Sequence, residues 1–420
     1  MSIKSRFQPL LEQRQQNFLH RRRPIVTSAQ TDKMQIDGLE VINFSSNDYL
    51  GLANHPVIKQ KLIEALQSDE ISYGAGAAHL VTGHHQQHHL AESEIANWLG
   101  CESSLLFSTG YMANLAVQQT LMQSNDIILA DKLNHASLID GALQSAANLK
   151  RYPHLDMSAL ERRLQQASVT HKETGGQSLI VTDGVFSMDG DLAPLKTIQK
   201  LAQQYSAWLL VDDAHGFGTL GKNGKGCFEY FGLEPDENTI LMGTLGKAFG
   251  CSGAFVAGSS VLIETLIQFA RPYIYTTAMP QLNAVAIREA LRLVQKNQAS
   301  RETLNLHIQQ FRQGALEMGL QLWDSPSPIQ PIILGESETA LAWSESLKQQ
   351  GFWVSAIRPP TVPSGQARLR VTLSAKHTSE QINQLLKALK QCQVQFPTTA
   401  INGSKHHLGT MPHASDILFS

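Results

Sequence analysis

Short, mainly apolar runs recur along much of the chain, and segments of helical pattern lie between them. Six such runs occupy residues 104–108, 127–130, 179–182, 208–211, 240–242 and 254–257. Continuous apolar strands that alternate with helices are typical of a parallel sheet covered by helices on both faces. Ligands bind at the carboxyl ends of the strands in such sheets. The sequence therefore predicts an α/β protein whose functional residues follow these runs directly.

A lysine, a carboxylate and an imidazole follow two of the runs. Lys247 lies in Thr244-Leu-Gly-Lys-Ala-Phe-Gly250, and Asp212 and His215 follow the run that ends at residue 211. A lysine amine can form a Schiff base with pyridoxal 5'-phosphate (PLP), and a carboxylate can keep its pyridine nitrogen protonated. The combination predicts PLP as the cofactor and disfavours the alternative that Lys247 is a solvated surface lysine.

Asp213 competes with Asp212 for the carboxylate role, and a strand-end aspartate can also be a helix N-cap. Side chains alternate in direction along a strand, so only one of the two neighbours faces a ligand. A further histidine, His135, has the alternative interpretation of a loop histidine without a function.

The phosphate of the cofactor requires hydrogen-bond donors. Ser108-Thr-Gly-Tyr-Met-Ala-Asn114 is expected to start a helix after a strand. The first amides of a helix lack intrahelical partners and favour an anion. Gly110 and Tyr111 are therefore assigned to the cofactor, with hydroxyl groups from Ser187 and Thr244.

Composition excludes several classes of protein. The 420 residues carry a formal net charge of −2, and 17% of them are charged, which disfavours a general nucleic-acid or membrane-surface binder. The four cysteines have no paired spacing, as expected for reduced thiols in a cytoplasmic protein. The sequence has no apolar run near the ~18 residues of a membrane span, and its start lacks the apolar core of a signal peptide.

The chain is expected to divide into four parts. A helix over residues 4–20, stopped by Pro24, belongs to an N-terminal arm of residues 1–45, and a large α/β domain follows over 46–295. Residues 296–396 read as a smaller α+β domain whose last helix opens with the capping-box spacing Thr378-Ser-Glu-Gln381. The polar segment 397–420 is expected to be a mobile tail.

Four histidines open a helix that is expected over residues 85–99 and to end at Gly100. His84, His85, His88 and His89 include i, i+4 pairs that could ligate a metal. No acidic or cysteine partner is expected close by in sequence, and PLP chemistry needs no metal. We therefore interpret this segment as a polar helix start and expect no metal site.

Across residues 5–395 the chain resembles the α-oxoamine synthases, PLP enzymes of the aspartate-aminotransferase fold. The motifs that carry the resemblance are Asn43-Phe-Ser-Ser-Asn-Asp-Tyr-Leu-Gly51, Asn134-His-Ala-Ser137, Gly184-Val-Phe-Ser-Met-Asp-Gly190, Asp212-Asp-Ala-His-Gly216, Thr244-Leu-Gly-Lys247 and Ile357-Arg-Pro-Pro-Thr-Val-Pro363. The last motif resembles the branch of the family that acts in biotin synthesis.

The resemblance implies a role for each matching residue. It selects Lys247, His135 and Asp212 as catalytic, with His135 stacked on the cofactor ring and His215 bonded to the ring oxygen. It implies that Thr277, in Tyr275-Thr-Thr277, reaches the cofactor of a partner subunit, and hence a homodimer with shared active sites. The substrate-binding residues that it implies are Arg21, Asn47, His135, Arg358, Thr361 and Arg370.

The resemblance further implies a decarboxylative condensation of L-alanine with a pimeloyl thioester. Whether the acyl carrier is coenzyme A or acyl-carrier protein is left open. Three alternatives remain: a sister synthase that uses glycine and a short acyl-CoA, a PLP lyase or aminotransferase, and a non-catalytic partner subunit. The segment 357–363 argues against the first, the family-wide motifs against the second, and the presence of Lys247, Asp212 and His135 against the third.

Overall fold

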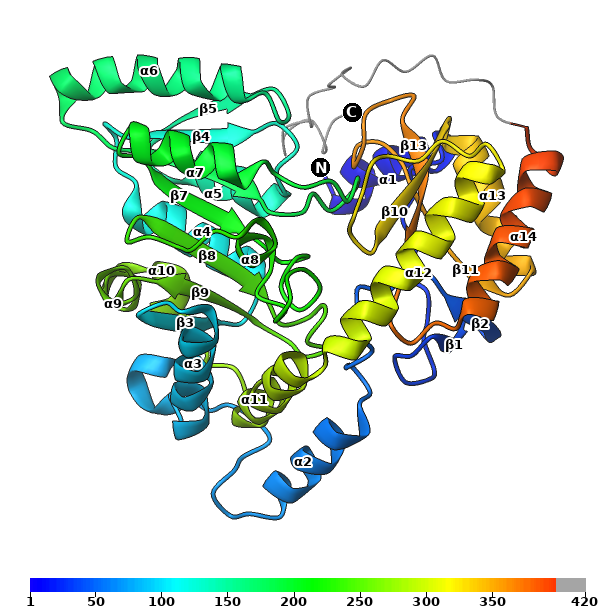
Figure 1. The fold of residues 1–420 in the computed structure, drawn as a ribbon, viewed down its shortest axis with the longest axis horizontal. Helices are drawn as coiled ribbons and strands as arrows, with labels where there is room; N and C mark the ends of the chain where they lie inside the picture. The colour runs from blue at the N-terminus through cyan, green and yellow to red at the C-terminus, as the bar shows by residue number, and fades with distance from the viewer. Residues whose placement is uncertain (398–420) are drawn as a thin grey trace. The chain divides into compact units, whose positions relative to one another are not determined.

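The computed structural model describes residues 1–397, which form two compact units. The larger unit comprises Asn47–Ser187 and Asp191–Leu304, and the smaller one comprises Met1–Ser46, Met188–Gly190 and the chain from Asn305 onward. Figure 1 shows the elements of both units coloured along the chain. The expected tail, apart from Pro397, lies outside the described residues.

A seven-stranded sheet forms the centre of the larger unit, in the order β3-β9-β8-β7-β6-β4-β5. Its strands are β3 (Ser103–Phe107), β4 (Ile127–Asp131), β5 (Asn148–Tyr152), β6 (Ser178–Asp183), β7 (Trp208–Asp212), β8 (Thr239–Thr244) and β9 (Ala254–Gly258). Strands β5, β4, β6, β7 and β8 pair in parallel, whereas β9 is antiparallel to both β8 and β3. The predicted α/β class with a mainly parallel sheet is therefore confirmed.

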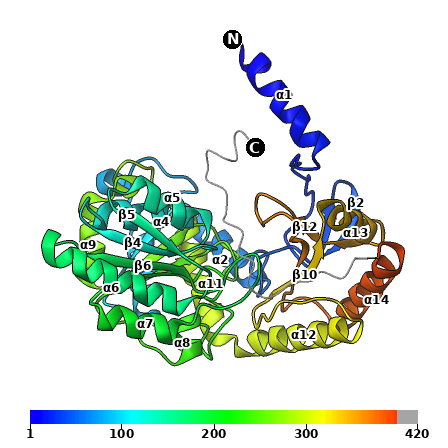
Figure 2. The same cartoon turned by 90° about the horizontal axis from the view of Figure 1, so that it is seen from above.

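Helices cover the sheet on both faces (Figures 1 and 2). Helices α4 (Gly110–Leu121), α5 (Ala136–Gln144) and α9 (Ser260–Phe269) bury apolar side chains in one cluster with β3, β4, β6, β7, β8 and β9. Helices α6 (Met157–Thr174) and α7 (Leu195–Gln204) lie on the opposite face. The remaining helices of this unit are α2 (Pro56–Leu66), the π-helix η1 (His79–Gly83), α3 (Gln86–Leu99), α8 (Cys227–Phe231), α10 (Arg271–Ile274) and α11 (Gln281–Lys296).

The smaller unit contains two three-stranded sheets, β1-β2-β11 and β10-β13-β12. The strands are β1 (Lys33–Ile36), β2 (Leu39–Asn43), β10 (Ile329–Gly335), β11 (Phe352–Trp353), β12 (Ser355–Ile357) and β13 (Ala367–Thr372). Most of α12 (Gln298–Glu317), together with α13 (Ser337–Gln349) and α14 (Ser379–Gln395), completes the unit with the N-terminal helix α1. The predicted capping box of Thr378 and Gln381 is present at the start of α14.

The prediction for the first helix is wrong at its end. Helix α1 covers Ile3–Gln16, contains Pro9 and stops well before Pro24. The Leu19 amide bonds the Arg14 carbonyl at 2.8 Å, and Phe18 has a left-handed φ of 57°, as in a closed helix end. Arg21 consequently lies in the segment after the helix rather than in its last turn.

Candidate active site

Three strands of the larger unit bring polar groups to one edge of the sheet. Asp183 ends β6, Asp212 ends β7, and the two residues are register partners. Asp212 is also paired with Met242 on β8, and Lys247 follows the end of β8 by three residues. The amine of Lys247 influences the pKa of both His135 and Asp183. The structure thus brings together the three residues that the sequence predicts to be catalytic.

The backbone around Lys247 is fixed by hydrogen bonds within the β8–β9 connection. The Leu245 amide donates to the Gly253 carbonyl at 2.9 Å, and the Gly250 amide donates to the Lys247 carbonyl at 2.8 Å. Gly250 has a φ of 63°, and a Cβ there would lie 2.2 Å from the Ala53 nitrogen. Only glycine fits this position, and the close contact with Ala53 restricts the conformation of the turn that carries Lys247.

Asp212 is connected to His135 by a chain of hydrogen bonds. The Asn114 amide on α4 donates to Asp212 Oδ2 at 2.7 Å and to Ser137 Oγ at 2.8 Å. Ser137 Oγ lies 2.7 Å from His135 Nδ1, which also accepts the Ser137 backbone amide at 3.3 Å. Because Ser137 Oγ accepts from Asn114, its own proton points at His135 Nδ1. The neutral imidazole therefore carries its proton on Nε2.

His135 precedes α5, and its backbone amide donates to Asp183 Oδ2 at 2.7 Å. His135 is exposed, but the protein atoms around its ring lower the pKa of the imidazole. The Asp212 carboxylate raises this pKa, and the Lys247 amine lowers it further. Burial raises the pKa of Asp183 well above its usual range, and the neighbouring Asp212 carboxylate raises it further. The surroundings of Asp183 therefore favour its protonated form beside Asp212.

Asp213 faces a different environment from Asp212. Its Oδ2 accepts the Cys227 amide at 2.6 Å, and burial raises its pKa to about 7. A Cβ on any of three surrounding glycines, Gly184, Gly216 and Gly226, would lie 2.6 Å or less from this carboxylate. The backbone of these glycines encloses the Asp213 carboxylate. Asp213 and Asp212 therefore face different surroundings, as expected for neighbouring side chains that alternate in direction.

His215, Asn47 and Tyr49 form a second polar group in the larger unit. The Tyr49 hydroxyl lies 2.6 Å from His215 Nδ1 and 3.1 Å from Asn47 Oδ1. Only 5% of His215 is exposed, so its ring orientation is fixed by packing as well as by this contact.

The expected phosphate donors lie at the start of α4, after β6 and at the end of β8. Thr109 caps the helix by accepting the Met112 amide at 3.2 Å, so Gly110 and Tyr111 occupy its first two positions. The Tyr111 hydroxyl donates to Asp140, and this bond raises the tyrosine pKa to about 12. Ser187 is half-buried in the segment after β6. Thr244 Oγ1 already donates to the Gly253 carbonyl at 3.1 Å and can still accept a hydrogen bond.

The expected carboxylate-binding arginine lies on β13 of the smaller unit. Arg368 and Arg370 are two residues apart and so face the same side of the strand. Arg368 is 1% exposed and is bound by the Asp189 carboxylate and, at 3.0 Å, by the Gln366 carbonyl. Arg368 is thus committed to an internal ion pair, and Arg370, 8% exposed, is the better candidate for a ligand.

The three expected acyl-binding residues meet in the smaller unit. Arg21 Nη2 lies 3.4 Å from Thr361 Oγ1, and Arg358 donates to the Phe18 carbonyl. Burial lowers the pKa of Arg358, and the charge of Arg21 lowers it further. Two guanidinium groups and a hydroxyl in this arrangement suit a carboxylate or its ester.

Thr277 is exposed and forms an isolated antiparallel bridge with Ala78. Tyr275 beside it is 73% exposed, and Leu80 and Val81 across the bridge are 52% and 74% exposed. The larger unit therefore presents apolar surface around the threonine.

The larger unit fits PLP by the chemistry of its donors. It supplies an amine at Lys247, a buried carboxylate at Asp212, a neutral imidazole at His135 and the amides that open α4. Sequence reasoning assigned no role to Asn114, Ser137 and Tyr49, which hold these groups in place. A buried amide inside the apolar stretch Met112-Ala-Asn-Leu-Ala-Val117 was the signal for Asn114.

Comparison with known proteins agrees with this arrangement. The family model for aminotransferase class I and II matches residues 40–389. The chain belongs to this family.

Two curated relatives illustrate the similarity. The chain is 68% identical to an 8-amino-7-oxononanoate synthase from Hydrogenovibrio crunogenus, over 95% of this chain and 98% of the relative. It is 52% identical to the enzyme of that name from Stutzerimonas stutzeri, over 92% and 96% of the two chains.

Solved structures of the family share the fold. A serine palmitoyltransferase from S. paucimobilis with bound PLP–myriocin superposes with a TM-score of 0.87 at 28% identity, over 94% of this chain and 99% of the other. An 8-amino-7-oxononanoate synthase from Francisella tularensis gives a TM-score of 0.72 at 34% identity, over 85% and 98%. Among residues 1–397, no helix is long and apolar enough to cross a membrane.

Proposed function

We propose that the chain is a PLP-dependent 8-amino-7-oxononanoate synthase of biotin synthesis. It condenses L-alanine with a pimeloyl thioester and releases carbon dioxide, a free thiol and 8-amino-7-oxononanoate. The 68% identity to the Hydrogenovibrio crunogenus enzyme supports the reaction. The cluster of Arg21, Arg358 and Thr361 is the observation that carries the choice of acyl substrate, because the far end of a pimeloyl chain is a carboxylate or its ester.

The larger unit, which covers most of the domain expected over residues 46–295 and extends to Leu304, holds the cofactor. PLP, when bound, supplies an electrophilic carbon for the amino group of alanine and a ring that accepts negative charge. Asp212 keeps the proton on the pyridine nitrogen, and His135 and His215 position the ring. The amides of Gly110 and Tyr111 and the hydroxyls of Ser187, Thr244 and the partner's Thr277 bind the phosphate.

Lys247 is the base that removes the proton from the α carbon of alanine, at its Nζ. Arg370 and Asn47 bind the alanine carboxylate, and Arg370 offers a planar fork that matches it. In the smaller unit Arg21, Arg358 and Thr361 bind the distal end of the acyl chain. The neutral His135 can donate from Nε2 to a substrate carboxylate without competing with Lys247 for the α proton.

A cytoplasmic homodimer with two shared active sites is part of the proposal. Thr277 lies amid exposed apolar side chains, which a second copy of the chain would cover. The acyl carrier is coenzyme A or acyl-carrier protein. Analytical ultracentrifugation of the holoenzyme tests the dimer, and a monomer that is fully active would exclude shared sites.

Product identification tests the function directly. The holoenzyme is incubated with L-alanine or glycine, each paired with pimeloyl-CoA, pimeloyl-acyl-carrier protein or acetyl-CoA, and the products are identified by mass spectrometry. We expect 8-amino-7-oxononanoate from L-alanine and a pimeloyl thioester at a far higher rate than any other product. Equal turnover of glycine with acetyl-CoA would refute the substrate assignment and leave the PLP chemistry intact.

A further inference from the structure

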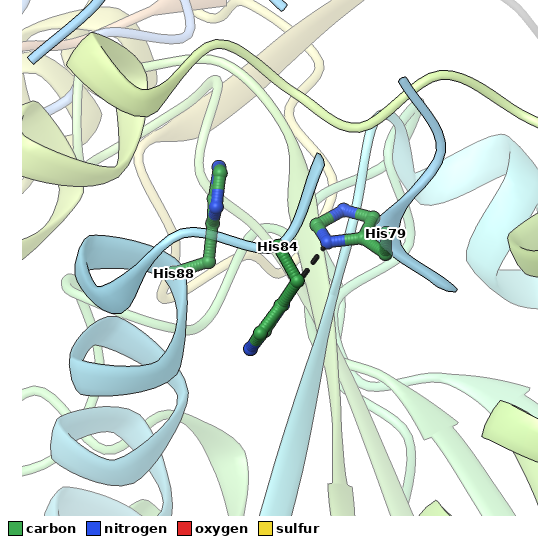
Figure 3. Close-up of side chains that lie close together, drawn as sticks. All are labelled: His79, His84 and His88. Carbon is green, nitrogen blue, oxygen red and sulfur yellow. Dashed lines mark hydrogen bonds between the residues drawn. The ribbon is translucent and has the colours of Figure 1, made fainter. Parts of the chain in front are cut away.

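A second cluster of titratable side chains lies in the larger unit at the start of α3, apart from the residues assigned to the reaction. His79 comes from η1, His84 from the segment between η1 and α3, and His88, His89 and Glu92 from α3. Figure 3 shows His79, His84 and His88, with the contact between the first two dashed. One ligand atom each of His84, His89 and Glu92 lies within 4.8 Å of the others, and the same holds for His79, His84 and His88.

Hydrogen bonds exclude the trio that contains His88. Its Nδ1 accepts the His85 amide at 3.0 Å, and its Nε2 donates to the Met279 carbonyl at 2.9 Å. Both ring nitrogens are thus committed to the capping box of α3 and to the neighbouring chain segment. The expectation of a polar helix start is confirmed for His85 and His88.

The trio of His84, His89 and Glu92 remains open to a ligand. All three residues line a cavity of about 580 Å³, and His88 does not. His84 Nε2 lies 3.9 Å from Glu92 Oε2, too far for a hydrogen bond and close to the separation of two ligands on one ion. The expectation that no acidic partner is near in sequence is wrong, since Glu92 follows His89 by three residues on one helix face.

Glu92 is a buried carboxyl that faces this cavity. The residue is 8% exposed, and Oε1 accepts the Leu106 amide at 2.9 Å. Among the ion pairs of residues 1–397, the only partner of Oε2 is the His84 ring, 3.9 Å away. A divalent cation bound at Oε2 would neutralise the charge of this buried carboxylate.

His79 supplies the supporting contact that a metal-binding histidine requires. Its Nδ1 lies 3.1 Å from His84 Nδ1, so one of the two nitrogens carries the shared hydrogen. When His84 Nδ1 donates, its Nε2 lone pair points toward Glu92, and the ring has the tautomer of a metal ligand. The His79 ring is itself stacked on Tyr273, with centroids 5.1 Å apart and planes inclined by 13°.

We propose that His84 Nε2, a ring nitrogen of His89 and Glu92 Oε2 bind a Zn²⁺ ion in this cavity, with water in the fourth position. Two imidazoles and one carboxylate are a common ligand set for zinc with one open position. The ligand atoms must move closer together on binding, because tetrahedral Zn–N and Zn–O bonds of about 2.0–2.2 Å place two ligand atoms roughly 3.3–3.6 Å apart. His84 and His89 are exposed, so the ion reaches the site from solvent.

The test uses the full-length holoenzyme after dialysis against a chelator. Zinc binding is measured by equilibrium dialysis, with PLP absorbance and circular dichroism as checks of folding. We expect one ion per chain, with at least tenfold weaker binding in His89→Asn and in Glu92→Gln. His85→Asn is the matched control, since His85 lies in the same segment but outside the trio. X-ray absorption should show two imidazole nitrogens and carboxylate oxygen around zinc.

Two outcomes would overturn the proposal. One is wild-type zinc affinity in both His89→Asn and Glu92→Gln. The other is a zinc spectrum with sulfur ligands, or with a ligand set that the two substitutions leave unchanged. Because His89 is exposed, its variant should fold normally, and a loss of binding there cannot be attributed to an unfolded chain.

Discussion

At the scale of single residues, the surroundings of Lys247 determine which groups hold protons. His135 stays neutral because the protein around its ring disfavours the imidazolium form. Burial of Asp183, which is 3% exposed, raises the pKa of its carboxyl group, and the neighbouring Asp212 carboxylate raises that pKa further. Because His135 Nδ1 accepts from Ser137 and its Nε2 carries the proton, neither ring nitrogen is placed to take the α proton instead of the Lys247 amine.

We expect Lys247→Ala to fold and to retain PLP weakly through the remaining contacts. Turnover and the visible absorption of the lysine–cofactor imine should both be lost, because the Schiff base and the base catalyst are the same amine. Absorption spectra and product formation measure the two effects. Lys222→Ala, at an exposed position, is the control and should behave as wild type. Near-normal turnover of Lys247→Ala would refute the assignment.

Asp212→Asn and Asp213→Asn should differ sharply. An amide at position 212 cannot stabilise a protonated ring nitrogen, and loss of a charged hydrogen bond costs about 1.5–3 kcal/mol. Exchange of the α proton of L-alanine in deuterated water, followed by NMR, should slow about ten- to a hundredfold. Asp213→Asn keeps an oxygen for the Cys227 amide, so its exchange rate should change much less. The reverse order would mean that Asp213 serves the ring.

Arg21→Ala should raise the Michaelis constant for a pimeloyl thioester about ten- to a hundredfold and leave that for L-alanine nearly unchanged. The reason is the loss of one charged hydrogen bond, worth about 1.5–3 kcal/mol. Arg22→Ala is a matched control, because Arg22 is 76% exposed and pairs with Asp37 instead. Steady-state kinetics with both substrates measure the two Michaelis constants. Equal effects of Arg21→Ala and Arg22→Ala would show that Arg21 does not bind the acyl chain.

At the scale of elements, the hydrogen bonds of Asn114 connect three segments. Asn114 on α4 bonds Asp212 at the end of β7 and Ser137 on α5, and Ser137 bonds His135. The partners are 98 and 23 residues away from Asn114 in the sequence. One side-chain amide therefore links the orientation of the Asp212 carboxylate to that of the His135 imidazole.

Asn114→Ala should slow α-proton exchange about tenfold, because the buried Asp212 carboxylate loses a charged hydrogen bond. The pH profile of exchange should also shift, since His135 Nδ1 loses the fixed hydroxyl proton of Ser137. Gln119→Ala is the control on the same helix, because the Gln119 side chain bonds Gln144, away from Asp212 and His135. If the pH profile is unchanged and only the free energy of unfolding falls, Asn114 has a purely structural role.

The sequence predicted those elements whose pattern is local. All six apolar runs became strands of the larger unit, and Lys247, Asp212 and His215 follow strand ends as expected. Strand β5 escaped prediction because Asn148 and Lys150 are exposed at the sheet edge, where apolar continuity is not required.

The Asn114 chain was not predictable from spacing, because its contacts join residues that only the folded sheet brings together. The end of α1 is closed locally by the Leu19–Arg14 bond and the left-handed Phe18, and the distant contact there, between the Phe18 carbonyl and Arg358, spans 340 residues.

At the scale of the whole molecule, His154 connects two carboxylates of the larger unit. Its Nδ1 lies 2.9 Å from Asp131 Oδ1, and its Nε2 lies 2.8 Å from Asp191 Oδ2. Burial acts to lower the pKa of His154, but its bonds to the two carboxylates outweigh burial and raise it to about 10. The imidazolium form therefore stabilises the folded chain.

The contribution of His154 to stability should depend on pH in a defined direction. The folded pKa is about 10 and the unfolded one about 6.5, so the contribution is complete below about pH 6.5 and is lost as the pH rises through 10. We expect the difference in urea midpoint between wild type and His154→Gln to be large near pH 6.5 and to shrink toward pH 10. Exposed His20→Gln is the control. A difference that is independent of pH would contradict a charged His154.

The closed turn between β8 and β9 has a mechanical consequence for Lys247. The main chain there is held at Gly250 and by the hydrogen bond between Leu245 and Gly253. The backbone of Lys247 therefore stays in place while its side chain moves. When the amine is freed by an incoming amino acid, it remains tethered within the length of one side chain. The same amine therefore serves as nucleophile and as base. It returns to its starting position after each cycle without rearrangement of the backbone.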